Sequence, residues 1–154
     1  MQPQATARLA EILLTRGLRS ADVAAADALR VARGLPRWAA DLRPGDLPVG
    51  LGVDDALADA KGCYLGQEAV AKIRNLGHPP LVLRHLKSAR PVEVGASVHT
   101  LDGPVGEVTS VAEAPPGAAL LARVRWGAGD APLRLDDGTP LVADAGAHGP
   151  RPLD

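Results

Sequence analysis

Apolar positions at helical spacing open the chain. Residues 5–16 carry leucine or isoleucine at intervals of three and four, which predicts an amphipathic helix that ends at Gly17. An alanine-rich stretch over residues 21–31 predicts a second helix, with Ser20 as its N-cap and aspartates in its early turns. We therefore expect two helices before Gly34.

Proline and glycine then interrupt the pattern. Residues 35–59 contain both types repeatedly, which predicts an irregular loop with at most a short helix over 54–60. Loops of this length in a compact domain commonly carry function. Helical spacing returns over 68–73, where one or two turns are expected before the Pro79-Pro80 pair.

From residue 81 onwards, short apolar runs alternate with turn residues at a spacing of about ten, which is typical of a small all-β barrel or sandwich. The turns are predicted at 102–104, 115–117 and 136–138, and residues 146–154 form a Gly/Pro-rich tail that we expect to be flexible. The predicted strands are Leu81–Leu86, Val98–Leu101, Val105–Val111, Leu120–Trp126, Leu133–Leu135 and Leu141–Ala143.

Composition agrees with a globular protein, since 46% of the 154 residues are apolar and 23% are charged. Without phenylalanine, the core must consist of leucine, valine and alanine, and we assign Trp38 and Trp126 to it as well. The single cysteine excludes an intramolecular disulfide. The first residues have neither the basic region nor the apolar region of a signal peptide, so a cytoplasmic protein is expected. No apolar stretch approaches the roughly 18 to 20 residues that cross a bilayer, so membrane insertion is not expected.

Charge is distributed unevenly along the chain. Residues 1–60 carry seven basic and eight acidic side chains, residues 61–90 carry six and one, and residues 91–154 carry four and nine. The middle segment is therefore positive within an otherwise acidic chain. Such a segment attracts a polyanionic ligand, RNA or an acidic protein face, or it is simply a solvated surface.

The basic segment begins with Lys-Gly-Cys-Tyr-Leu-Gly-Gln-Glu at 61–68, which holds both the single cysteine and the single tyrosine. Glycines at 62 and 66 permit backbone angles that a side chain would forbid, and Lys61 can stabilise the thiolate form of Cys63. A lone cysteine is more often a small buried apolar residue. The polar, glycine-rich neighbourhood favours a functional thiol.

The octapeptide, followed by Ala71, Lys72 and Gly77, closely resembles the signature of the YgfZ-type folate-binding proteins, relatives of the glycine cleavage T-protein (aminomethyltransferase). The segment 28–36 is similar to the Arg-Ile-Glu-x-Gly-x-Pro segment of that family, and Arg30 matches its arginine. The resemblance covers about residues 10–145 and corresponds to the C-terminal half of a typical member.

The resemblance implies an α+β fold, in which a partial ferredoxin-like α+β domain is followed by a small six-stranded antiparallel β-barrel. The domains would then be residues 1–80, which carry the motif, and residues 81–145, which form the barrel, followed by the flexible tail. The N-terminal domain that helps to enclose folate in the family has no counterpart in this sequence, so a separately encoded N-terminal half or a homo-oligomer could complete the pocket.

By resemblance, tetrahydrofolate is the expected cofactor. The candidate contacts that the motifs carry over are Arg30, Tyr64, Gln67, Glu68 and Lys72. The chain departs from the family at two positions, because Ala32 stands where the family has glutamate and Gly50 stands in place of an acidic residue. Each change would remove a hydrogen bond to the pterin, worth about 1 to 3 kcal/mol where a buried polar group is left unpaired.

In the family, the cysteine motif is associated with the assembly or repair of iron–sulfur clusters in client enzymes, some of which modify tRNA. Cys63 would then be the functional thiol, tuned by Lys61. One cysteine cannot hold a cluster that needs about four ligands, so a transient or shared ligand, or a sulfur nucleophile, is expected rather than a resident metal. The four histidines match no zinc-ligand spacing.

Three functions remain open from the sequence. The first is a non-enzymatic accessory protein that acts on an iron–sulfur client through Cys63. The second is an aminomethyltransferase-like one-carbon transferase that uses a folate. The third is a module that binds RNA or protein through the basic segment, with a structural cysteine.

Overall fold

A computed structural model describes residues 3–58 and 62–144 of the chain. Lys61 and the tail at 146–154 lie outside the described residues. The helices are α1 (Pro3–Thr15), α2 (Val23–Ala32) and α3 (Gln67–Leu76), with short 3₁₀ turns at Asp54–Ala56 and Trp126–Ala128. The strands are β1 (Leu81–Ser88), β2 (Ser97–Thr100), β3 (Gly103–Ala114), β4 (Gly117–Arg125), β5 (Leu133–Leu135) and β6 (Pro140–Ala143).

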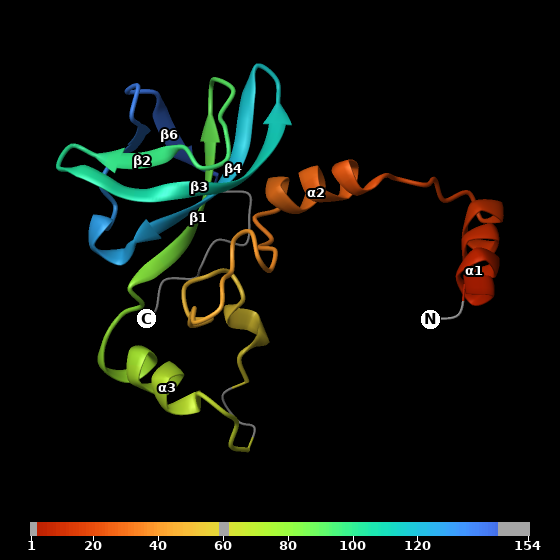
Figure 1. Ribbon diagram of the computed structural model, residues 1–154, viewed down its shortest axis with the longest axis horizontal. Helices are drawn as coiled ribbons and strands as arrows, with labels where there is room; N and C mark the ends of the chain where they lie inside the picture. Colours follow the sequence, from red (N-terminus) through yellow and green to blue (C-terminus); the bar gives the residue numbers. More distant parts are fainter. Residues whose placement is uncertain (1–2, 59–61, 145–154) are drawn as a thin grey trace.

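The six strands form a closed antiparallel barrel in the order β1-β4-β3-β2-β5-β6 (Figure 1). Together with the helices, the barrel confirms the predicted α+β class. The part of the chain before the barrel that the structure describes contributes helices, loops and one isolated bridge between Trp38 and Leu42. No helix among the described residues is both long and apolar enough to cross a membrane.

The barrel interior is a core of aliphatic side chains, with Val98, Val108 and Leu120 at its centre and no more than 1% exposed. A second cluster lies outside the barrel, where Val31 of α2 packs with Leu121 of β4 and with residues from the loop after α2. Strand β4 is therefore covered on both faces. This explains why residues 118–122 form a continuous apolar run rather than an alternating one.

Close approach between strands depends on two glycines. A Cβ at Gly106 in β3 would lie 2.0 Å from the carbonyl oxygen of Arg123 in β4. A Cβ at Gly117 would lie 1.8 Å from the carbonyl oxygen of Ser88 in β1. Real Cβ atoms do not come this close to backbone, so the barrel admits no larger residue at either position without a shift of the strands.

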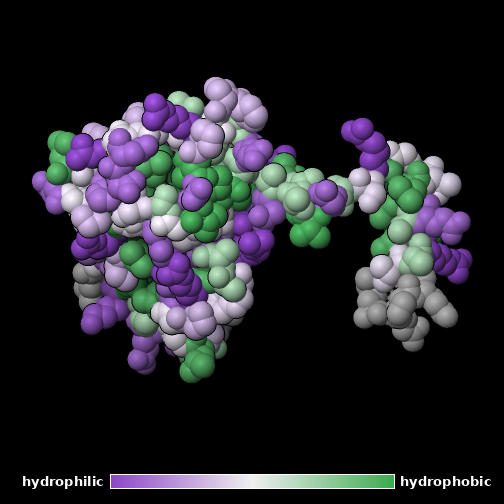
Figure 2. All heavy atoms as spheres, turned by 45° about the horizontal axis from the view of Figure 1, so that its top comes forward, coloured by the Kyte–Doolittle hydropathy of each residue, from purple (hydrophilic) through white to green (hydrophobic). Residues whose placement is uncertain are grey.

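Helix α1 stands apart from the barrel, at the end of an extended segment (Figure 1). Its apolar side chains remain between 39% and 55% exposed, and the space-filling view shows hydrophobic surface on a helix separated from the main body (Figure 2). The exposed side chains are Leu9, Ile12, Leu13 and Leu14. The predicted amphipathic helix is confirmed, but its apolar side does not pack against the barrel.

Several local predictions need correction. Helix α2 begins at Val23, and its N-cap is Asp22 rather than Ser20, because an Asp22 carboxylate oxygen accepts the backbone N–H of Ala25 at 2.7 Å. Most strands and α3 are longer than predicted, since ladder pairing and packing extend elements beyond their apolar centres. Trp38 and Trp126 are 63% and 37% exposed, so their assignment to the core was wrong.

Candidate functional site

The described part of the motif, residues 62–68, forms an exposed turn that leads into α3. Cys63 is free and exposed, and the next residues fold into a turn that ends at Gly66, with φ of 86°. This left-handed conformation favours glycine, which explains the second glycine of the motif. The thiol therefore lies on the surface, next to the start of a helix.

Two hydrogen bonds close the turn. The backbone N–H of Tyr64 donates to the Oε1 of Gln67 at 3.0 Å, and the backbone N–H of Gln67 donates to the carbonyl oxygen of Tyr64 at 3.3 Å. This reciprocal arrangement resembles a capping box, in which a side chain in the first helical turn satisfies a backbone donor before the helix. The motif thus fixes the backbone immediately after Cys63.

The remaining motif residues lie along α3. Glu68 is in the first turn, where its charge interacts favourably with the helix dipole. Lys72 lies one turn later and is exposed, at the spacing of a favourable Glu–Lys pair. Val70 of this helix is buried, with 5% exposed. The structure therefore brings Cys63 and the α3 candidates into one exposed turn and helix.

Arg30 lies elsewhere, between α2 and the barrel. Its guanidinium donates to Asp27 at 2.6 Å, to Asp41 at 2.7 Å, to the hydroxyl of Ser110 at 2.8 Å and to the carbonyl oxygen of Leu35 at 3.2 Å. These contacts occupy most of its donors. Its hydrogen bond is also the main reason why the pKa of Asp27 is lowered.

Asp41 is the centre of this network and is fully buried. Besides Arg30, its carboxylate accepts the backbone N–H of Arg37 at 2.9 Å and the hydroxyls of Thr109 and Ser110 at 2.6 and 2.7 Å. Adjacent strand residues normally point to opposite faces, but the register of β3 shifts between Val108 and Ser110. This bulge allows both hydroxyls to reach the same carboxylate.

A second ion pair extends the network. Arg123 of β4, whose side chain is 6% exposed, donates to the carbonyl oxygen of Asp41 at 2.9 Å and contacts both carboxylate oxygens of Asp46. The hydrogen bond from Arg123 is the main cause of a lowered pKa for Asp46, and it raises the pKa of Arg123 in turn. These residues were not predicted from the sequence, because nothing local marks a loop aspartate as buried.

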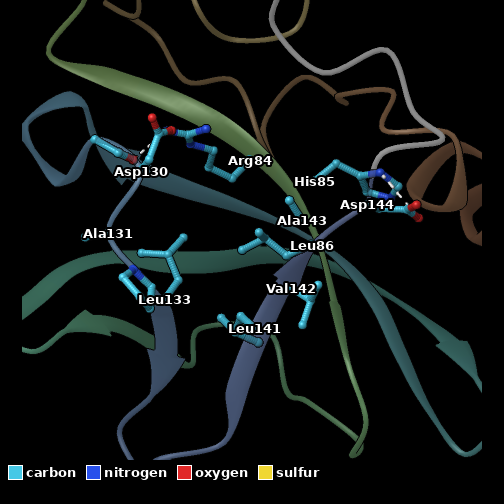
Figure 3. A pocket seen from close by; sticks show the side chains of 12 residues that line it. Arg84, His85, Leu86, Asp130, Ala131, Leu133, Leu141, Val142, Ala143 and Asp144 are labelled. Carbon is cyan, nitrogen blue, oxygen red and sulfur yellow. Dashed lines mark hydrogen bonds and ion pairs between the residues drawn. The ribbon is translucent and has the colours of Figure 1, made fainter.

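His85 is a further buried polar residue that the sequence did not single out. Its ring lies on the side of β1 where Asp144 follows β6, with Nδ1 3.7 Å from a carboxylate oxygen of Asp144 (Figure 3). Neither ring nitrogen has a hydrogen-bond partner in the described part of the chain. Burial lowers the pKa of His85, and the nearby Asp144 offsets part of this effect.

Two separate places hold the predicted folate contacts in the described part of the chain, with Arg30 on α2 and the others in the turn before α3 and on α3. Arg30 lines a hollow of about 390 Å³ beside β3. None of the α3 candidates lines any of the three cavities whose linings are fully described. Ala32, where the family has glutamate, is exposed and carries no hydrogen-bonding side chain. These three cavities therefore do not unite the predicted contacts, and the folate site stays a prediction.

No protein-family model matches the chain, and no curated protein matches its sequence. Among solved structures, the fold is similar to that of the glycine cleavage system aminomethyltransferase T from Bartonella henselae, with a TM-score of 0.73 and 22% identity. The match covers 92% of this chain and 43% of the Bartonella chain, so this chain spans less than half of that protein.

The match confirms the predicted relation to the aminomethyltransferase T fold. At this level of identity it concerns the fold alone. The narrower relation to YgfZ-type proteins, the domain boundaries and the roles of the predicted site residues remain predictions.

Proposed function

We propose that this protein is a YgfZ-type accessory factor of the cytoplasm that supports iron–sulfur enzymes, including enzymes that modify tRNA, through the thiol of Cys63. The observation that carries the proposal is the position of the thiol. Cys63 is exposed on a turn whose backbone is fixed by the Tyr64–Gln67 hydrogen bonds. A partner protein can reach such a thiol without unfolding of the barrel.

The chemistry of a single thiol limits its role. Iron–sulfur clusters usually take four protein ligands, and the described residues contain no group of three or more histidine, cysteine or acidic side chains that could hold a metal. Cys63 would therefore act as a transient ligand shared with the client protein. The basic side chain of Lys72 on α3, the helix that follows the turn, would favour an acidic client surface.

Complementation tests this role. A strain that lacks the gene would receive wild type, Cys63→Ala or Val142→Ala, the last a matched truncation of an exposed residue on β6. We expect Cys63→Ala to leave iron–sulfur enzyme activities at the level of the deletion and Val142→Ala to restore them. Protein abundance is measured in parallel. Since Cys63 is exposed, Cys63→Ala should leave folding and therefore abundance unchanged. Full restoration by Cys63→Ala would refute the proposal.

The alternative is a folate-dependent one-carbon transferase, and the fold shared with aminomethyltransferase T is the observation that favours it. The dispersed positions of Arg30 and the α3 candidates argue against a complete folate site within the described residues. Calorimetric titration with tetrahydrofolate tests this alternative. Absence of saturable heat at millimolar ligand would remove the transferase, whereas saturable heat would show a folate site, which a YgfZ-type factor would share, and would keep the transferase in place.

A further inference from the structure

A groove of about 430 Å³ lies at one end of the barrel, between the turn that joins β2 to β3 and the segment that follows β4. Its size falls within the range of small-molecule sites. Its walls are largely apolar, and its polar groups come from His78, Thr100, Asp102 and Arg125. None of these residues belongs to the cysteine motif or to the Asp41 network.

An aromatic pair forms part of the wall. The rings of Trp126 and His78 stack with centroids 5.4 Å apart and planes 7° apart. Trp126 is 37% exposed, and tryptophan is on average more deeply buried. Stacked aromatic rings at the edge of a groove offer a surface on which a further planar ring can stack.

A positioned cation lies beside this pair. The Nη2 of Arg125 donates to the carbonyl oxygen of Pro104, which holds the guanidinium against the groove. In the part of the chain that the structure describes, no carboxylate forms an ion pair with Arg125. Its other N–H groups can therefore donate to an anion, and guanidinium suits phosphate particularly well.

The groove also offers an acceptor. Asp102 is exposed in the turn between β2 and β3, where its backbone N–H donates to the hydroxyl of Thr100 at 3.3 Å. Its carboxylate can accept from an amine or ring N–H of a heterocycle. Aromatic surface, cation and carboxylate together fit a planar heterocycle that carries N–H donors and a negative group.

We propose that this groove binds a nucleotide, with the base against the Trp126–His78 pair, the phosphate at Arg125 and a base N–H group at Asp102. The site is separate from Cys63, so Cys63→Ala should leave nucleotide binding unchanged. The two proposals can therefore fail independently.

Tryptophan fluorescence provides the test, since the chain has two tryptophans and Trp38→Phe leaves Trp126 as the reporter. In this background we expect saturable quenching by AMP. Adenosine and ribose 5-phosphate should each bind about tenfold more weakly or worse, because each lacks one recognised group. His78→Ala should weaken both AMP and adenosine, since it removes part of the stack.

The decisive variant is Arg125→Ala. It should weaken AMP binding about tenfold or more and leave adenosine binding unchanged, a split that a purely structural role would not produce. Arg16→Ala removes the same charge at the residue after α1, outside the groove, and should change neither. Absence of saturable quenching up to about 10 mM AMP, or equal AMP affinity in Arg125→Ala and its parent, would overturn the proposal.

Discussion

Replacing Asp41 by alanine would remove the acceptor that joins α2 and the following loop to the barrel. Four donors would lose a partner: the guanidinium of Arg30, the backbone N–H of Arg37 and the hydroxyls of Thr109 and Ser110. Removal of one partner from a buried ion pair costs about 3 to 5 kcal/mol, because the remaining charge and donors stay buried. That is a large fraction of the about 5 to 15 kcal/mol by which domains are stable.

Urea unfolding followed by far-ultraviolet circular dichroism would measure this loss as a change in the free energy of unfolding. Asp41→Asn keeps one oxygen acceptor and should lie between wild type and alanine. Arg43→Ala is the matched control, since it breaks an ion pair with Glu107 in which both side chains are exposed, by 48% and 43%. This variant should lower the free energy of unfolding by less than about 1 kcal/mol. A loss below about 1 kcal/mol for Asp41→Ala at unchanged m-value would refute the reasoning.

Three further outcomes are expected. The unfolded chain protonates His85 near its ordinary pKa of 6.5, whereas burial lowers the pKa in the folded chain, so stability should fall as pH decreases below about 6.5. Unfolding free energies at pH 7 and pH 5 would show a smaller fall in His85→Leu, and an identical fall would contradict this. Gly106→Ala should lower the melting temperature strongly or prevent folding. Gly127→Ala is the control and should change the melting temperature little, because a Cβ there meets nothing within 4 Å. Equal shifts in the two variants would contradict the close contact at Gly106. Backbone amides of α1 should exchange with deuterium much faster than those of β4, because an isolated helix of 13 residues has only marginal stability in water. Equal protection of the two elements would show that α1 is covered in solution.

The sequence predicted most elements because their signals are local. Apolar spacing located α1 and the strands, and glycine and proline located most of the turns. The N-cap of α2 was misplaced, since Ser20 and Asp22 are equally suitable in sequence and only the path of the chain selects between them. The motif was visible as a turn, and Gly66 adopts the left-handed conformation that a glycine there permits.

The buried polar network could not be predicted from the sequence. Asp41 and Thr109 are 68 positions apart, and their contact depends on a bulge that apolar periodicity does not reveal. The exposure of Trp38 and Trp126 was missed for a related reason, since burial depends on which other segment covers a side chain. Arg30 matched a family motif, yet the fold surrounds it with Asp27, Asp41 and Ser110.

The sequence by itself determined the order of helices and strands, the cysteine motif and its local turn, because these depend on spacing and backbone preference within a few residues. Only the tertiary structure decided that α2 is tied to the barrel through Asp41, that the α3 candidates lie apart from Arg30, and that Trp126 joins His78 and Arg125 at a groove. Such placements depend on contacts between segments far apart in the sequence, 48 positions for His78–Trp126 and 68 for Asp41–Thr109, and no local pattern encodes them.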